Sequence, residues 1–291
     1  MLGKPESLTI WFVLKAHNPL GALLEGLPCG RLVLKLAADE AELEAVHKLR
    51  YRIFNEELGE GIPENAVLGL DVDEFDSHCD HLMVIDHGKV VGTYRLLHGP
   101  NRPSKGFYSE TEFDLSSLAI DPEVTVELGR GCIDNAHRKQ TTLMALFWGL
   151  NKYMVAKGAR YLIGCGSLPL MSNDDAEATF AKLVAENHTD LSTGVAPLPD
   201  NDFKGDATKG TPKVPPLAQF YIEFGAKILG RPAFDPIFRC FDLFMFFDHE
   251  KLSTWGRDLL DRFDKRLSTA SGSTVSETAG APHEKTTPRN A

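Results

Sequence analysis

The chain has 291 residues, of which 43% are hydrophobic and 25% are charged, so it is long enough to bury a sizeable core as one large domain or two small ones. Its formal net charge of −10 argues against a nucleic-acid-binding protein, because phosphate binding needs clustered Lys and Arg. The five cysteines are scattered and include no CxxC pair, which is typical of a reduced cytosolic protein.

The two ends of the chain differ from the middle. The apolar stretch LTIWFVLKAHNPLGALL is interrupted by charged residues and a proline, so we expect neither a transmembrane helix nor a signal peptide. Residues 1–30 are predicted to be an extension that packs against the domain, with contact to a membrane surface as the alternative. The domain itself is predicted to span residues 31–266. Residues 267–291 have almost no large apolar side chains and are predicted to be a disordered tail.

The hydrophobic periodicity of the domain switches between strand and helix. Residues 32–36 alternate like a short strand, and residues 39–58 open with acidic side chains, as a helix does at its positive end. Strands are predicted at 81–85 and 90–97, joined by a hairpin turn in which Gly88 takes a positive φ.

The second half of the domain also alternates between predicted helices and strands. The run TTLMALFWGLNKYMVA is apolar on nearly all sides, which is typical of a buried helix. The complete order indicates a single α/β domain with a mixed central sheet flanked by helices. The further strands are expected at 124–132, 160–168 and 240–248, and the further helices at 141–156, 174–186 and 217–229.

Three arginines lie inside apolar elements, where a guanidinium is costly unless it is paired. Arg50 falls in the middle of the apolar stripe of the first helix, between Val46 and Phe54. Arg95 and Arg130 lie within predicted strands. The acidic segment DVDEFD offers Asp73, Glu74 and Asp76 as partners for Arg50, either in a structural ion pair or in the wall of a substrate cleft.

The stretch VELGRG places Glu127 and Arg130 three residues apart in a strand. Strict alternation would put the two side chains on opposite faces. Gly129 offers a β-bulge, which would bring both side chains onto one side and leave backbone N–H groups unpaired. Unpaired N–H groups can hold a developing oxyanion, so the sequence predicts a reaction centre here.

Other polar residues give weaker signals. His78, Cys79 and His81 lack a second ligand cluster, so we interpret them as loop residues and expect no metal site. Cys165, flanked by glycines, is interpreted as a small packed residue rather than a nucleophile.

The motifs LRYRIF, DEFD, GKVVGTYRLL and VELGRGCI, in this order, resemble the GNAT-fold acyltransferases that use acyl-carrier-protein thioesters. The resemblance covers about residues 32–248. The family has two branches, the acyl-homoserine-lactone synthases and the hemolysin-like N-acyltransferases that acylate amino acids such as ornithine. The segments FYSETEFDLSSL and PPLAQFYIEFGAKILGRPAFDP favour the second branch, and ELGEGI lacks the tryptophan that lactone synthases carry there.

The resemblance implies transfer of a fatty acyl group, 3-hydroxylated by expectation, to the α-amine of an amino acid, with ornithine as the favoured acceptor. The donor would be acyl carrier protein, with acyl-CoA as the weaker alternative, because HRKQTTLMAL lacks the glycines that cradle a CoA pyrophosphate. No bound cofactor is expected. Lactone synthesis and a non-catalytic binding or membrane-associating module remain the alternatives. The implied location is the cytoplasm, with transient association with the inner membrane.

The resemblance also implies residue roles. Glu127 would be the general base, and Tyr221, in a Tyr-x-x-x-Gly pattern, would protonate the leaving thiolate or else be a core aromatic. One arginine would bind the acceptor's carboxylate, and Asp73 or Asp76 would receive a cationic side chain. The complete predicted site has Glu127, Arg130 and Tyr221 as catalytic residues; Arg50, Phe54, Asp73, Asp76 and Arg95 around the acceptor; and Gly129, Gly131, Arg138 and Lys139 facing the acyl donor, the last two as contacts to carrier protein or as solvated charges.

Overall fold

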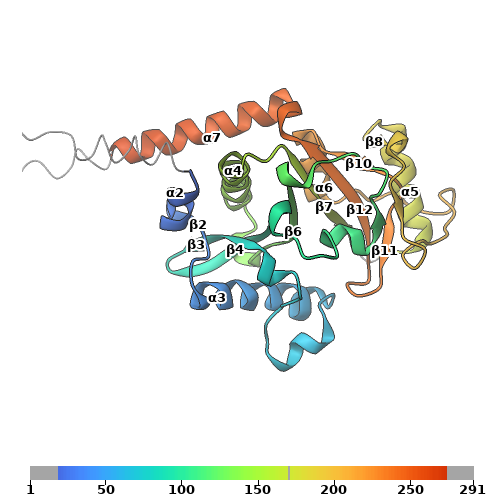
Figure 1. The fold of residues 1–291 in the computed structure, drawn as a ribbon, viewed down its shortest axis with the longest axis horizontal. Helices are drawn as coiled ribbons and strands as arrows, with labels where there is room; N and C mark the ends of the chain where they lie inside the picture. The colour runs from blue at the N-terminus through green and yellow to red at the C-terminus, as the bar shows by residue number, and fades with distance from the viewer. Residues whose placement is uncertain (1–18, 170, 274–291) are drawn as a thin grey trace, which may run out of the picture.

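The computed structural model describes residues 19–169 and 171–273, with side chains through residue 267 (Figure 1). Its main sheet runs in the order β1-β2-β3-β4-β6-β7-β12-β10-β8, with β11 added beside β12, and a small separate sheet pairs β5 with β9. Neighbouring strands are antiparallel except β6–β7 and β10–β8, so the sheet is mixed as predicted. The strands are β1 (Leu27–Cys29), β2 (Leu32–Leu36), β3 (Asp80–Asp86), β4 (Lys89–His98), β5 (Phe113–Asp114), β6 (Thr125–Ile133), β7 (Tyr161–Leu168), β8 (Thr189–Asp190), β9 (Ala196–Pro197), β10 (Lys227–Leu229), β11 (Ala233–Asp235) and β12 (Cys240–Asp248).

Helices cover both faces of this sheet. Figure 1 shows α3 on one side of β3 and β4, with α2, α4 and α7 on the other. The described chain contains no helix that combines the length and the apolar character needed to span a membrane. The helices are α2 (Pro19–Glu25), α3 (Glu40–Tyr51), α4 (Gln140–Lys157), α5 (Asn173–Ala185), α6 (Pro216–Phe224) and α7 (Thr254–Ser273).

Most predicted elements are confirmed, and the exceptions have local causes. The first predicted helix changes at Arg52 into a π-helix, Arg52–Leu58, which ends at Gly59 in the left-handed conformation. The predicted helix over residues 217–229 ends at Phe224, because Gly225 takes a φ of 116° that an α-helix cannot continue. The residues that follow form β10 instead.

The ends of the domain also differ from expectation. Residues 19–29 belong to the fold, since α2 packs against α4 and β1 pairs with β2. α7 was not predicted; it extends to Ser273, past residue 267 where the tail was predicted to begin, and it buries Leu260 against the core. Residues 1–18 and 274–291, which carry the rest of both predictions, lie outside the described residues.

Candidate active site

Strand β6 contains the predicted bulge. Thr93 of β4 pairs with Cys132, but Arg95 pairs with Gly129, so Arg130 and Gly131 together oppose the single residue Tyr94. Arg130 has a φ of 49°, and the bulge is thus centred one residue later than Gly129. A Cβ on Gly131 would lie 2.4 Å from the Tyr94 ring, which explains the glycine at that position.

The bulge lies where two central strands separate. β6 and β7 pair only from Thr125↔Tyr161 to Glu127↔Ile163. Beyond that point β7 continues along β12, and in the described chain no strand pairs with the edge of β6 that faces β7. A cavity of about 690 Å³ opens between them, lined by both strands, α4, α6 and β12. Its walls include Phe54, Arg95, Glu127, Gly129, Arg130, Gly131, Arg138 and Tyr221 from the predicted site, whereas Arg50, Asp73, Asp76 and Lys139 do not reach it.

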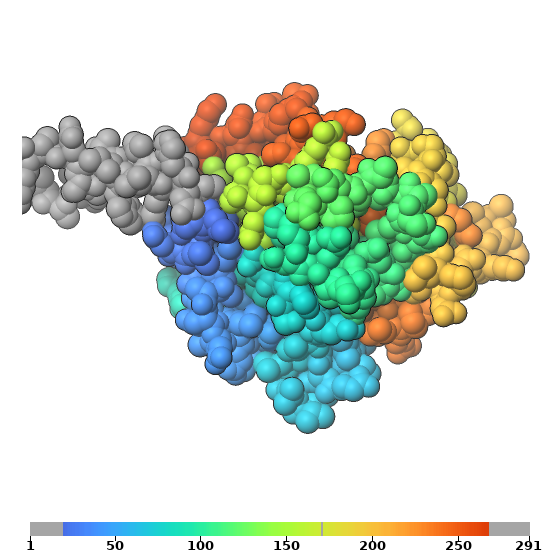
Figure 2. Space-filling view, viewed as in Figure 1, coloured from blue at the N-terminus to red at the C-terminus, as the bar shows by residue number. Residues whose placement is uncertain are grey.

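Glu127 is buried in the wall of this cavity and is held by the segment between β4 and β6, which covers the central part of the face in Figure 2. Its Oε2 accepts a hydrogen bond from the backbone N–H of Tyr108 (2.6 Å). Its Oε1 accepts from the N–H (2.7 Å) and the hydroxyl (2.6 Å) of Ser109. Burial raises the pKa of Glu127 above its ordinary value, and the hydrogen bonds oppose that rise. A carboxylate with a raised pKa is a stronger base.

Arg130 shares the Glu127 side of the strand, as predicted, since both side chains meet Tyr108. The Arg130 guanidinium lies over the rings of Phe238 (4.2 Å) and Tyr108 (5.3 Å). Its Nη2 donates to Asp73 (2.7 Å), and its Nε lies 3.4 Å from Asp71 Oδ2 in an ion pair that lacks hydrogen-bond geometry. Arg130 therefore places a positive charge in the cavity wall, where it can attract an anionic group.

The three embedded arginines are paired with three aspartates in what we call the ion-pair cluster. Arg50 is fully buried, with Nε 2.7 Å from Asp71 Oδ2 and Nη1 2.6 Å from Asp76 Oδ1. Burial opposes ionisation of Asp76, but Arg50 and then Arg95 hold the pKa of its carboxyl well below its usual range. The members of the ion-pair cluster are Arg50, Arg95, Arg130, Asp71, Asp73 and Asp76.

This pairing corrects three sequence-based expectations. Asp73 accepts from Arg95 (2.6 Å) and Arg130 (2.7 Å), so neither it nor Asp76 is free to receive a cationic side chain. Arg50 forms a buried ion pair, one of the two arrangements offered for it, and does not line the cavity. Glu74 is exposed and pairs with Lys105 at the surface rather than with Arg50. The sequence reasoning passed over Asp71, although it opens the same acidic segment.

Tyr221 lies in the cavity wall opposite the bulge. Its hydroxyl is 2.9 Å from that of Tyr94, and burial raises the pKa of Tyr221 to about 12. Gly225, the end of the Tyr-x-x-x-Gly pattern, caps α6. The pattern thus fixes the helix end, and the hydroxyl pair gives the cavity a proton donor.

The two residues predicted to contact a carrier protein differ. Arg138 is exposed at the edge of the cavity, where it pairs with Glu57 (2.5 Å) and donates to the backbone oxygen of Ile133 (3.1 Å). Lys139 is exposed at the N-cap of α4, away from the cavity. Arg138 is therefore better placed than Lys139 to contact a molecule that binds in the cavity.

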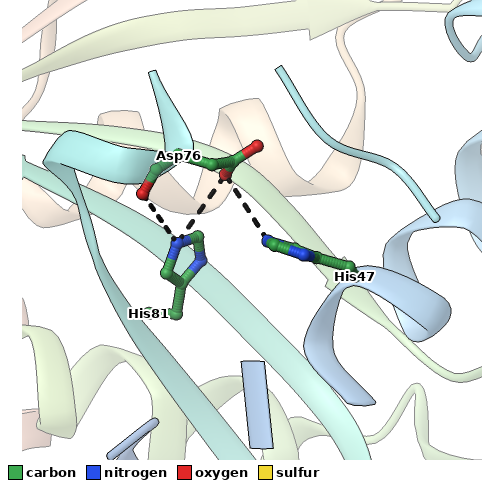
Figure 3. Close-up of side chains that lie close together, drawn as sticks. All are labelled: His47, Asp76 and His81. Atoms are coloured by element: carbon green, nitrogen blue, oxygen red, sulfur yellow. Dashed lines mark hydrogen bonds and ion pairs between the residues drawn. The ribbon is translucent and has the colours of Figure 1, made fainter. Parts of the chain in front are cut away.

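Two buried histidines lie behind the ion-pair cluster. Figure 3 shows the rings of His47, from α3, and His81, from β3, directed at Asp76. His81 is thus not a loop residue, and burial lowers its pKa to about 4. These three residues have ligand atoms within 4.8 Å of one another, but Asp76 already accepts hydrogen bonds from Arg50, whose positive charge disfavours a metal ion at this point.

Comparisons with known proteins agree with this geometry. The acetyltransferase (GNAT) domain family matches residues 49–148. The chain is 33% identical over 236 residues to the L-ornithine N(alpha)-acyltransferase of Agrobacterium fabrum (strain C58), covering 74% of this chain and 80% of that protein. The enzyme of the same name from Brucella abortus (strain 2308) is 30% identical over 253 residues, or 77% and 87% of the two chains.

Among solved structures, the CoA-dependent acyl-homoserine lactone synthase BjaI is similar at 16% identity and a TM-score of 0.47, over 79% of this chain and 83% of that one. The two enzymes above match along most of their own length. The sheet flanked by helices is the GNAT acyltransferase fold predicted from the motifs. The chain belongs to the GNAT-fold N-acyltransferases, the family that contains these L-ornithine Nα-acyltransferases.

Proposed function

We propose that this N-acyltransferase moves a fatty acyl group from an acyl carrier protein to the α-amine of ornithine. The observation that carries the proposal is the cavity at the point where β6 and β7 separate. It brings together a buried carboxylate, an arginine in the cavity wall and a long apolar wall from α4, α6 and β12. The names of the relatives support ornithine as the acceptor.

The reaction forms a C–N bond and breaks a C–S bond. Glu127 accepts a proton from the acceptor's ammonium group, directly or through a water, and the free amine attacks the thioester carbon. Backbone N–H groups at Gly129 to Gly131, on the unpaired edge of β6, stabilise the oxyanion. Tyr221, hydrogen-bonded to Tyr94, gives its proton to the leaving phosphopantetheine thiolate, which departs as a thiol. The second proton, which the attacking nitrogen loses as the amide forms, restores the Tyr221 hydroxyl, and Glu127 releases the first to solvent. Arg130 holds the acceptor's carboxylate.

The donor is part of the proposal. A carrier protein presents its acyl chain on phosphopantetheine, which needs no pyrophosphate cradle, and the stretch HRKQTTLMAL has none of the usual glycines. Arg138, at the cavity edge, would meet an acidic carrier protein. The acyl chain, 3-hydroxylated in this proposal, would lie along the apolar wall. The product is a lipid, so transient binding at the inner membrane face follows, and co-sedimentation with liposomes in the presence of product tests it.

The test is an assay with purified chain, 3-hydroxyacyl carrier protein and L-ornithine, read by mass spectrometry. We expect Nα-acylornithine from the unmutated chain and a loss of about 10²–10⁴-fold in kcat for Glu127→Gln. Acyl-CoA in place of the carrier protein should give a much lower kcat/KM. Absence of any acylated amino acid would contradict the proposal. Methylthioadenosine from S-adenosylmethionine would establish lactone synthesis instead.

Ser109→Ala separates a base from a merely structural carboxylate. The substitution removes one hydrogen bond to Glu127 Oε1 and leaves the carboxylate in place. Since that bond lowers the pKa of Glu127, its loss should shift the acidic limb of the pH–rate profile to higher pH. An unmoved limb would show that Glu127 only anchors the Tyr108 segment.

A further inference from the structure

Three carboxyl groups that the proposed mechanism does not use lie together beside the cavity. Glu112, Asp235 and Asp242 each have 3% of their surface exposed. Asp242 lies at the centre, since its carboxylate is within 4.8 Å of both Glu112 and Asp235. We call these three residues the acidic cluster.

The acidic cluster lacks partners of opposite charge. In the described chain no Lys, Arg or His forms an ion pair with any of the three carboxylates. Both oxygens of Glu112 and Oδ1 of Asp242 also lack a hydrogen-bond donor among the described residues. Asp235 is anchored through the N–H groups of Ile237 (2.7 Å) and Phe238 (3.1 Å), and Oδ2 of Asp242 accepts a weaker bond from the Cys240 thiol (3.7 Å). Buried carboxylates normally have charged or hydrogen-bonding partners, so a cation bound among these three would supply what the described residues do not.

The electrostatics agree with the geometry. Burial, with repulsion from Asp242 and Asp235, raises the pKa of Glu112 far above that of an ordinary glutamate. Burial also raises the pKa of Asp242. A cation placed among the three groups would stabilise their charged forms and release a proton.

The acidic cluster belongs to the same cavity as Glu127. Asp235 and Asp242 are in the cavity wall, and Glu112 stands directly behind Asp242. The Tyr108 hydroxyl donates to Asp235 (3.5 Å), while the Tyr108 N–H donates to Glu127 (2.6 Å). One residue thus bridges the proposed base and the acidic cluster, so a small molecule in the cavity can reach both.

An ammonium group fits this place better than a metal ion. Cys165 and Cys240 stand beside the carboxylates, and burial raises the pKa of both thiols. Because metals bind the thiolate, a metal ion at this point would have to displace thiol protons that burial favours. An ammonium group needs only acceptor oxygens, which the acidic cluster supplies.

We propose that Asp242, Asp235 and Glu112 bind the side-chain ammonium group of a dibasic acceptor amino acid, while Arg130 holds its carboxylate and Glu127 receives the proton of its α-amine. This inference rests on the proposed function and names the residues that select its substrate. It replaces Asp73 and Asp76, which the arginines of the ion-pair cluster occupy.

Calorimetric titration of the full chain with L-ornithine and L-norvaline tests the inference. Norvaline has the same carbon skeleton without the side-chain amine. Each titration is run with and without a non-reactive thioether analogue of the acyl phosphopantetheine donor. We expect ornithine to bind at least about tenfold more tightly than norvaline, and Asp242→Asn to remove that preference while leaving the norvaline Kd unchanged.

Two further variants complete the design. Glu112→Gln has the shape of a protonated glutamate and should weaken ornithine binding by a smaller factor than Asp242→Asn. Asp202→Asn removes one negative charge at the surface, outside the cavity, and should leave both affinities unchanged. Thermal melting of each variant confirms that it is folded.

The outcomes are distinct. Equal affinities for ornithine and norvaline in the unmutated chain, or an intact preference in Asp242→Asn, would overturn the inference. A preference that chelator removes and Zn²⁺ restores would also overturn it, because the acidic cluster would then hold a metal. Selective ornithine binding without acyl transfer from any donor would contradict the proposed reaction and support the ammonium-binding site. Acyl transfer with equal affinity for ornithine and norvaline would support the reaction and contradict the ammonium-binding site.

Discussion

Two groups of buried charge, the ion-pair cluster and the acidic cluster, lie on either side of Tyr108. In the ion-pair cluster each aspartate lies within 3.5 Å of at least one guanidinium nitrogen. In the acidic cluster no cationic side chain of the described chain forms an ion pair with the carboxylates, and both oxygens of Glu112 lack a hydrogen-bond donor there. Tyr108 connects the two, because its ring contacts Arg95 and Arg130 and its hydroxyl donates to Asp235.

The difference indicates what each group is for. A buried ion pair with all its partners present contributes to the fold, and only the donors it leaves over can bind a ligand. A buried carboxylate without a cationic partner either keeps its proton or needs a ligand that supplies the missing charge, and it destabilises the free protein at pH values where it ionises. Equally buried charged residues therefore stabilise the fold in the ion-pair cluster and destabilise it in the acidic cluster. Measurements of the free energy of unfolding distinguish the two.

Arg50→Met should have the largest effect on stability. It removes one partner from the ion-pair cluster and leaves Asp71 and Asp76 buried without the group that neutralises them. We expect a loss of about 3–5 kcal/mol in the free energy of unfolding, measured by urea denaturation at pH 7.

Arg52→Met is the matched control for this change. Arg52 lies two residues later, 41% exposed, and pairs with Asp134 at the surface. Its replacement should change the free energy of unfolding by less than about 1 kcal/mol. Similar losses in the two variants would show that the ion-pair cluster has no special role in the fold.

The two histidines behind the ion-pair cluster should make the free energy of unfolding depend on pH, with an effect smaller than that of Arg50→Met. Because burial lowers the pKa of His81 from 6.5 to about 4, the unfolded chain binds a proton more readily than the folded chain between these values. The contribution of His81 to stability should therefore fall by about 3 kcal/mol as the pH drops from 6.5 to 4, and His47 adds a change of the same sign, while the buried carboxyl groups with raised pKa values contribute with the opposite sign.

His81→Asn should remove the His81 contribution to the pH dependence of stability, and the difference between the two chains isolates it from the carboxyl groups that both chains share. Asp73 and Asp76, whose pKa values are lowered, contribute below the ordinary aspartate pKa of 3.8. The measurement is urea unfolding at half-unit pH steps from 3 to 8. An unchanged slope between pH 4 and 6.5 would show that His81 is not kept neutral by burial.

Much of the ion-pair cluster could be predicted from the sequence. Arg50, Arg95 and Arg130 stood out because each interrupts an apolar pattern, and the acidic segment 71–76 offered partners. The glycine beside Arg130 predicted the bulge, which the strand register confirms. What the pattern did not decide was which carboxylates the arginines use, because side-chain pairing depends on how a loop folds back over the sheet.

The acidic cluster was not predicted, although the sequence contains one indication of it. Asp242 interrupts CFDLFMFFD in the same way that Arg50 interrupts its helix, and the segment was interpreted only as a strand. Glu112 lies 130 positions earlier and reaches Asp242 only through the tertiary fold. Local periodicity carries no information on such a contact. The same limit applies to α7, whose apolar positions gain their meaning from packing against α4 and α6.

Glu112→Gln should have the smallest effect on stability, and of opposite sign to Arg50→Met. Because the pKa of Glu112 is raised in the folded chain, the folded state holds its proton at pH values where the unfolded state has lost it. The unmutated chain therefore loses stability as the pH rises above the ordinary glutamate pKa of 4.5, and glutamine, which cannot ionise, escapes this loss.

We thus expect Glu112→Gln to gain about 0.5–2 kcal/mol at pH 8, measured by urea unfolding without amino acid, and the gain to vanish near pH 5. Saturating L-ornithine should narrow the difference at pH 8, since it stabilises the unmutated chain more than the variant. A variant that is less stable than the unmutated chain at pH 8 would mean that Glu112 has a stabilising partner within the protein. The acidic cluster would then not differ from the ion-pair cluster in lacking such partners.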